Sequence, residues 1–125
     1  MKHSGKSQER NHHRKEKFLE ICLLVLLGGE AAHGYRLLEQ LGQFGYASED
    51  VDVGALYRTL RRMEENDLVL SEWEDSDQGP NRRKYFITPE GHRALETRIE
   101  HMKHRIEYMN RVLEYHEQQK QRSTP

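Results

Sequence analysis

The spacing of apolar residues changes once along this chain, and the change restricts the folds it can adopt. Up to about residue 66, apolar side chains recur every three or four residues, the period of a helix buried on one side. Over Leu68–Glu74 and Arg82–Thr88 the period falls towards two, and Val, Trp, Tyr, Phe and Ile are frequent, as in strands. Turn-forming residues 75–81 lie between these segments. The pattern therefore predicts helices followed by a two-stranded hairpin.

Three helices are predicted before the hairpin. The first runs from about residue 13 to residue 27, is apolar nearly all round, and ends at Gly28. The second spans about Ala32–Gln43. The third spans about Val53–Asn66, with Asp52 placed as its N-cap. Two strands around a polar tip, directly after a pair of helices, indicate a wing.

A long helix is predicted after the hairpin, from Pro89 to about residue 121. Thr88 is its expected N-cap, because proline suits the first helical position. Its apolar residues are spaced 4, 3, 4, 3, 4, which is a heptad seam of just under three heptads. Such a short seam favours packing on a symmetry mate and on the first helix; packing on its own domain alone is the alternative. The predicted dimer interface comprises Phe18, Ile21, Cys22, Val25, Leu95, Ile99, Met102, Ile106, Met109 and Leu113.

The charges are distributed unevenly, although the formal net charge is only −1. Residues 1–17 contain six basic and two acidic groups. Residues 58–62 and 82–84 each contain three basic groups and no acidic one. Because solvent screens charge beyond roughly 8–10 Å, local basic patches attract a phosphate backbone whatever the total charge. The net charge therefore does not exclude nucleic acid.

The third predicted helix has the arrangement of a recognition helix. Leu56, Leu60 and Met63 share one face and arginines project from the other. Small residues at its N-terminus would let it enter a major groove, where arginine bonds guanine or phosphate. The alternative is a solvated surface helix with an Arg61–Glu65 pair. The residues assigned to DNA here are Gly54, Ala55, Tyr57, Arg58, Arg61 and Arg62.

The predicted wing begins its second strand with Asn81, Arg82, Arg83 and Lys84. Three adjacent cations repel one another unless an anion is present, and a minor groove or a row of phosphates supplies one. The alternative is a charged edge that prevents strand aggregation. Further phosphate contacts are predicted for Lys15, Lys17 and Tyr35.

Three segments resemble the PadR family of bacterial transcription regulators: His33–Glu39, Val53–Val69 and Gly79–Gly91. They are similar, in order and spacing, to the family's Gly-Tyr-x-Leu helix, its Tyr-x-x-Leu-x-x-Leu-Glu recognition helix and its Arg-Lys-Tyr-Tyr wing. The chain departs from the family pattern at Gly54-Ala55, Met63, Asn66-Asp67 and Ile87. The resemblance implies a homodimer, commonly a repressor. The single C-terminal helix implies the smaller subgroup, in which aromatic or amphipathic molecules bind near the dimer interface.

The chain is therefore expected to be mainly α with a small β-hairpin: a winged helix-turn-helix DNA-binding domain plus a C-terminal dimerisation helix. We expect a flexible basic arm at 1–12, the winged-helix body at 13–88, the dimerisation helix at 89–121 and a flexible tail at 122–125. The expected partners are pseudo-palindromic double-stranded operator DNA, a second copy of the chain and a small aromatic or amphipathic effector. The residues predicted to contact the effector are Trp73, Met102, Tyr108 and Met109.

Two other functions stay open. A metal-responsive regulator could use His101 and His104 with Glu100 and Glu107 on the last helix, but no recognised ligand spacing is present, so no metal site or cofactor is predicted. A winged-helix adaptor that binds no DNA is the second alternative. An enzyme is not expected, since the sequence has no glycine-rich phosphate loop and no nucleophile motif.

The cellular location is predicted from Cys22 and from the apolar runs. A single cysteine fits a reducing compartment. The longest apolar run, residues 21–27, is far shorter than the ~20 residues that a membrane span requires. A cytoplasmic protein without a membrane partner is expected.

Overall fold

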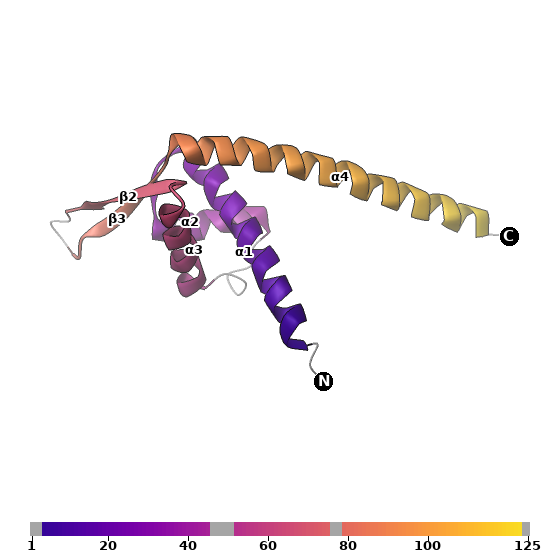
Figure 1. Ribbon diagram of the computed structural model, residues 1–125, viewed down its shortest axis with the longest axis horizontal. Coiled ribbons are helices and arrows are strands. Elements are labelled where there is room, and N and C mark those ends of the chain that lie inside the picture. The colour runs from indigo at the N-terminus through magenta and orange to yellow at the C-terminus, as the bar shows by residue number, and fades with distance from the viewer. Residues whose placement is uncertain (1–3, 46–51, 76–78, 124–125) are drawn as a thin grey trace. The chain divides into compact units, whose positions relative to one another are not determined.

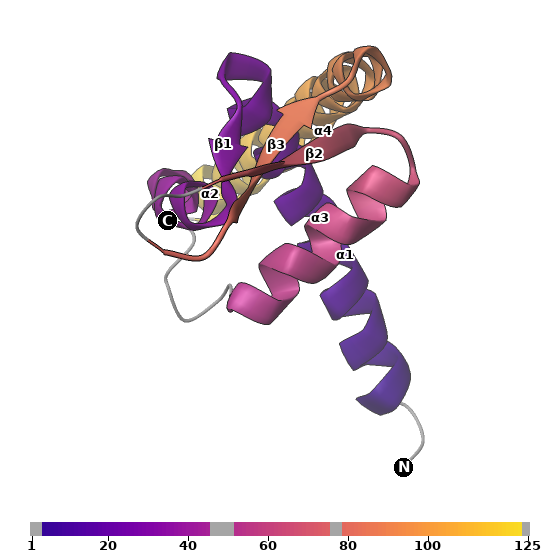
Figure 2. The same ribbon diagram turned by 90° about the vertical axis from the view of Figure 1, so that its left-hand side faces the viewer.

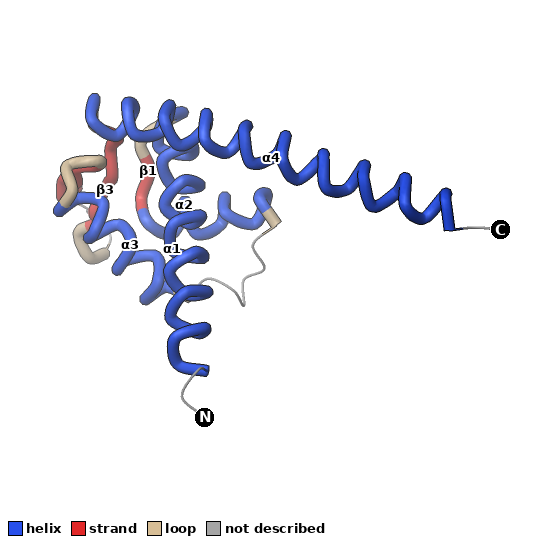
Figure 3. Tube along the Cα trace, turned by 45° about the vertical axis from the view of Figure 1, so that its right-hand side comes forward, coloured by secondary structure: helices blue, strands red, loops and turns tan. Residues whose placement is uncertain are grey.

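The computed structural model describes residues 4–45, 52–75 and 79–123, and it divides the chain into two units that meet after Leu95. It is mainly helical with one small antiparallel sheet, as predicted (Figures 1 and 3). The elements in order are α1 (Ser4–Gly29), β1 (Ala32–His33), α2 (Gly34–Gln40), the 3-10 helix η1 (Leu41–Phe44), α3 (Val53–Glu65), β2 (Val69–Glu74), β3 (Arg82–Ile87) and α4 (Pro89–Ser123).

The sheet has three strands in the order β1-β3-β2, with β3 between its neighbours (Figure 2). Strands β2 and β3 form the predicted wing hairpin, in which Ser71 is opposite Tyr85 and Trp73 is opposite Arg83. The sequence did not predict β1. It pairs Ala32 with Tyr85, and two residues are too few to show an alternating pattern.

The core of the first unit lies between α1, α2, α3 and the sheet. Its side chains come from every one of these elements, and Leu23, Leu37, Leu60 and Met63 are completely buried. Leu95, in the first turns of α4, packs against the same core. The sequence pattern therefore identified the buried face of α3 correctly. On α1 the core side chains are Leu19, Cys22, Leu23, Leu24 and Leu27, whereas Phe18 and Val25 are exposed, and the sequence did not distinguish these two sides.

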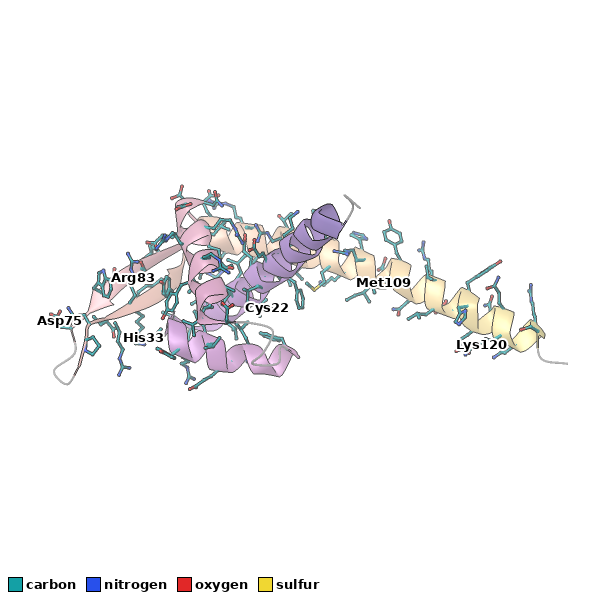
Figure 4. All side chains as sticks on the ribbon, turned by 90° about the horizontal axis from the view of Figure 1, so that it is seen from below. Cys22, His33, Asp75, Arg83, Met109 and Lys120 are labelled. Atoms are coloured by element: carbon teal, nitrogen blue, oxygen red, sulfur yellow. The ribbon has the colours of Figure 1, made fainter. Side chains whose placement is uncertain are left out.

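Cys22 belongs to this core, with 4% of its surface exposed. Figure 4 shows it among the helices. Burial raises the pKa of its thiol to about 11, because the thiolate would lose its hydration. The prediction that Cys22 lies in a dimer interface is corrected: α1 is apolar nearly all round, and the sequence could not show which side faces its own core.

The boundaries of several elements differ from those predicted. Helix α1 already begins at Ser4, so residues 4–12 of the expected flexible arm are helical; residues 1–3 lie outside the described part. The predicted second helix is divided into α2 and η1, and it starts later because Ala32 and His33 pair with β3. Helix α4 continues to Ser123, past the predicted end at 121; of the expected tail 122–125, residues 124–125 are not described.

Both predicted N-caps are confirmed. Asp52 Oδ1 accepts a hydrogen bond of 2.5 Å from the Ala55 amide at the start of α3. Thr88 Oγ1 accepts one of 2.9 Å from the Gly91 amide at the start of α4. Each bond satisfies an amide that has no partner within its helix. Within the described residues, no helix is long and apolar enough to cross a membrane.

Helix α3 ends in a Schellman motif. The Leu68 amide donates to the Met63 carbonyl at 2.9 Å, and the Asp67 amide donates to the Glu64 carbonyl at 3.1 Å. The motif requires the left-handed conformation at Asp67, whose φ is 62°. Glycine adopts this conformation without the Cβ penalty. Asp67 is thus a strained position at the junction of α3 and the wing.

Helix α2 approaches α3 closely at Gly34. A Cβ at this position would lie 2.5 Å from the hydroxyl oxygen of Tyr57 and 2.8 Å from the ring carbon that carries it. Glycine therefore leaves the space that the Tyr57 ring occupies. This contact fixes the position of the Tyr57 ring on α3.

We predict that Asp67→Gly stabilises the protein. Relief of left-handed strain outweighs the greater flexibility of glycine in the unfolded chain, and a gain of about 0.5–1 kcal/mol is expected. Urea unfolding monitored by circular dichroism measures it. Asp67→Ala, which keeps a Cβ in the same backbone conformation, is the matched control and should give no such gain. Equal stability of the two variants would contradict the strain at this position.

We predict that Gly34→Ala destabilises the protein by about 1–3 kcal/mol, because the added methyl group displaces the Tyr57 ring. The same substitution in a Tyr57→Ala background should cost much less, since no ring is left to displace. Thermal unfolding of the four proteins gives the coupling between the two positions. An identical loss in both backgrounds would show that the Gly34–Tyr57 contact is not its cause.

Candidate nucleic-acid interface

The outer face of α3 carries two of the three predicted arginines. Leu56, Leu60 and Met63 are buried, and Arg58 and Arg61 are exposed on the other side. Gly54 at the N-terminal end is exposed, Ala55 is half-buried, and Tyr57 is 39% exposed. The exposed N-terminal half of α3 therefore presents small residues first and cationic ones after them.

Arg62 points in a different direction. Its guanidinium lies 3.1 Å from Glu16 and 3.5 Å from Glu20, both on α1. Only 9% of the Glu20 side chain is exposed, so this ion pair is shielded from solvent on one side. The prediction that Arg62 projects with Arg58 and Arg61 is corrected. Arg62 instead holds α1 against α3, because the acidic residues of α1 lie on its side of the helix.

The cations of the wing lie on both faces of the hairpin. Since side chains alternate along a strand, Arg83 shares one face with Ser71, Trp73 and Tyr85, and the residues on either side of Arg83 occupy the other face. Arg83 is exposed on the hairpin, as Figure 4 shows. The three adjacent cations of the sequence are therefore not one cluster in space.

The second face of the wing contains an ion-pair cluster centred on Glu74. Lys84 Nζ lies 3.5 Å from one carboxylate oxygen, and His33 Nε2 lies 2.9 Å from the other. The hydrogen bond from His33 lowers the pKa of Glu74, and the charge of Lys84 lowers it further. Arg82 is opposite Glu74 in the strand register. This face of the wing is thus largely balanced in charge.

The Ser71 hydroxyl joins the wing to α3. It donates to the Glu64 carboxylate, with oxygen–oxygen distances of 2.9 and 3.0 Å. Tyr85, opposite Ser71, is buried, and burial raises the pKa of its hydroxyl. These contacts fix the wing relative to the exposed face of α3. Arg58, Arg61 and Arg83 therefore belong to one compact unit of the molecule.

The remaining predicted DNA contacts come from α1, from α2 and from the residue before β3. Tyr35 is 71% exposed in the first turn of α2. Lys17 is exposed on α1, and Asn81 is exposed before β3. Lys15 lies within α1, but its side chain is outside the described part.

The predicted dimer residues lie on α1 and on α4. On α1, Phe18 and Val25 are partly exposed, at 42% and 39%, and Ile21 is half-buried. On α4, the seam residues Leu95, Ile99 and Met102 are half-buried. The later seam residues are exposed: Ile106, Met109 and Leu113.

The four residues predicted to contact an effector are divided between the two units. Trp73 lies on β2 in the first unit, whereas Met102, Tyr108 and Met109 lie on α4 in the second. Tyr108 and Met109 are both exposed. Regarding the metal alternative, the part of the chain that the structure describes contains no group of three or more His, Cys, Asp or Glu residues able to hold an ion. His104 instead lies 3.9 Å from Glu107.

Sequence reasoning missed two features of this surface. The Glu74–His33 contact depends on β1, which has no recognisable pattern. The stacking of the Arg83 guanidinium on the Trp73 ring, 5.1 Å from the ring centre, depends on the strand register. The turn between the strands does not reveal that register, because its length leaves several pairings open.

Comparison with known proteins gives consistent results. Residues 23–97 match the transcriptional regulator PadR-like family. Transcriptional regulator Rv3488 of Mycobacterium tuberculosis is 43% identical over 63 residues, which are 50% of this chain and 55% of that protein, so the match spans about half of the relative.

Solved structures share the fold. A PadR-like transcription factor from Bacteroides fragilis is 29% identical with a TM-score of 0.74, over 83% of this chain and 98% of that one. Bacillus subtilis PadR in complex with operator DNA is 19% identical with a TM-score of 0.57, over 65% of this chain and 46% of that one, a similarity of fold alone. With three-fifths of its length matched and the winged-helix body in place, the chain belongs to the PadR-like family of transcriptional regulators.

Proposed function

We propose that this regulator binds duplex operator DNA through α3 and the wing, as a homodimeric repressor that a small molecule releases. The observation that carries the DNA-binding part is the exposed pair Arg58 and Arg61 on α3, a helix that the Ser71–Glu64 bond joins to the wing. An adaptor that bound no DNA would not require this arrangement of cations.

The chemistry of α3 suits a major groove. Its first turn presents the small residues Gly54 and Ala55, which allow the helix to approach the floor of the groove closely. One and two turns further on, arginines can donate two parallel hydrogen bonds to guanine O6 and N7. The operator complex of Bacillus subtilis PadR supports this use of the fold. Tyr35 and Lys17 would add phosphate contacts, which position the protein without reading sequence.

The homodimer is supported by the seam of α4. Ile106, Met109 and Leu113 follow one another at heptad spacing, and between 52% and 62% of each side chain is exposed in the single chain. Burying a large apolar side chain contributes about 1.5–3 kcal/mol, so a second copy of the seam is a favourable partner. A twofold dimer would place two α3 helices about one DNA turn apart, ~34 Å, on a pseudo-palindromic operator.

Repression and release by an effector are further parts of this proposal. The resemblance to the small PadR subgroup supports them, and so do the exposed Tyr108 and Met109, which offer an aromatic face and a flexible thioether. An aromatic or amphipathic molecule that binds the dimer better than the dimer–DNA complex would release the operator. Such a regulator acts where the operators are, in the cytoplasm.

We predict that Arg58→Ala with Arg61→Ala greatly weakens DNA binding while the fold is retained. Two lost arginine contacts should lower affinity by a factor of about one hundred, at roughly 1–3 kcal/mol each. The probe is a duplex that the wild-type protein enriches from a random-sequence pool, and fluorescence anisotropy over a range of salt concentrations measures binding. The slope of affinity against salt should also become shallower.

Arg93→Ala is the control for the loss of an exposed arginine outside α3. Arg93 lies on the exposed side of the first turns of α4, where it pairs with Glu90. Because an exposed pair contributes little, this variant should fold and bind as the wild type does. Failure of the wild-type protein to enrich any duplex, or equal losses in the α3 variant and the Arg93 variant, would contradict the proposed function.

We predict that Ile106→Lys with Met109→Lys converts the homodimer into monomers. Two ammonium groups in the seam would lose their hydration without gaining a partner, which costs several kcal/mol. Sedimentation velocity at several concentrations measures the oligomeric state. Glu107→Lys places the same side chain on a neighbouring face of α4 and should leave the dimer intact. A dimer that survives the double substitution would exclude the seam as the interface.

A further inference from the structure

Trp73, the single tryptophan of the chain, is exposed to solvent on the wing. Trp73 is 64% exposed, although a large aromatic ring on a strand is usually buried by neighbouring side chains. Its ring instead packs against a cation, because the guanidinium carbon of Arg83 lies 5.1 Å from the ring centre. The two residues are direct cross-strand partners on β2 and β3. This is a cation–π contact between neighbours held in register by the sheet.

Arg83 differs from the two cations beside it. Lys84 and Arg82 are on the other face, together with Glu72 and Glu74, and Lys84 forms an ion pair with Glu74. Arg83 forms no ion pair within the described residues of the chain. Its guanidinium also lies near the Tyr85 hydroxyl, whose pKa it lowers against the larger, opposite effect of burial. Two aromatic residues therefore fix its position, and its charge is available to a partner.

The face that holds Arg83 is also the face joined to α3. Ser71, two residues before Trp73 on the same face, bonds to Glu64 of α3. A DNA duplex that received α3 in its major groove would therefore meet this face of the wing at the adjoining minor groove. Arg82 and Lys84 would be turned away from it.

We propose that Arg83, positioned by Trp73, reads the minor groove of A·T-rich DNA beside the site bound by α3. This inference rests on the proposed function and specifies how the wing contributes to sequence preference. Trp73 is the positioning residue, and Arg83 is the residue that touches DNA.

The chemistry of the pair fits a narrow minor groove. Runs of A·T pairs narrow this groove and strengthen its negative potential, which attracts arginine. Stacking on an indole leaves the edge N–H groups of a guanidinium free to donate and restricts its rotamers before binding. A G·C pair adds the guanine N2 amino group to the floor of the groove, where it opposes the cation. Discrimination between A·T and G·C therefore follows from groove shape and charge, without a major-groove contact.

The experiment changes the base pairs under the wing and the residues above them. The full-length protein first enriches a duplex from a random-sequence pool, and footprinting locates the flanking A·T pairs. These are then replaced by G·C or by inosine·C, which shares the minor groove of A·T and the major-groove pattern of G·C. Anisotropy titrations compare the wild type with Trp73→Leu, Trp73→Phe and Arg83→Lys. Arg82→Lys is the matched control on the other face.

We expect wild-type affinity to fall about fivefold or more with G·C and to change little with inosine·C. Trp73→Leu and Arg83→Lys should lose this discrimination. Trp73→Phe should keep part of it, because a phenyl ring still provides an aromatic face for the guanidinium. Arg82→Lys should discriminate as the wild type does. Circular dichroism checks that the exposed substitutions leave the fold intact. A merely structural role for Trp73 would lower affinity for all three duplexes equally.

Two results would overturn the proposal. If the wild type binds the inosine·C duplex as weakly as the G·C duplex, its preference does not arise in the minor groove. If Trp73→Leu and Arg83→Lys discriminate as well as the wild type does, the stacked pair has no part in the reading. Neither result would contradict the proposal that the protein binds duplex DNA. If the wild type enriches no duplex at all, the proposed function fails and this inference fails with it.

Discussion

Burial of Leu56, Leu60 and Met63 on one side of α3 determines where every other side chain of that helix points. The three are completely or almost completely buried. Burial of each large apolar side chain contributes about 1.5–3 kcal/mol to stability, which is far more than an exposed arginine contributes through surface ion pairs. Arg58 and Arg61 are exposed because the helix cannot rotate without exposing this face. The surface proposed to meet DNA is thus a consequence of core packing.

The acidic residues explain why a chain of net charge −1 can carry such a surface. Glu16 and Glu20 bind Arg62 between α1 and α3, Glu64 accepts the Ser71 bond, and Glu74 joins His33 to Lys84. These carboxylates hold elements together from within or from the far face of the wing. Within the described residues, Arg58, Arg61 and Arg83 form no ion pair with any of these carboxylates. Total charge therefore says little about the partner of this protein, because several of its acidic residues are already paired within the fold.

Much of the fold follows from local patterns that the sequence displays directly. The helical stripes, the caps Asp52 and Thr88 and the alternation in the hairpin depend on neighbours within a few residues, and all were predicted. The direction of Arg62, the burial of Cys22 and the existence of β1 depend on residues far along the chain. A helical period cannot show which tertiary partner a given face meets. The separation of Arg83 from its neighbours required the strand register, which no residue of the turn determines.

One surface, formed by the outer face of α3 and the Trp73–Arg83 face of the wing, is proposed to meet duplex DNA. Backbone-amide NMR of the full-length protein, recorded with and without an enriched duplex, tests it most directly. We expect the largest changes in chemical shift to occur together within Val53–Arg61 and near Trp73 and Arg83, at the same stoichiometry. Changes confined to other parts of the chain, with α3 and the wing unaffected, would contradict it.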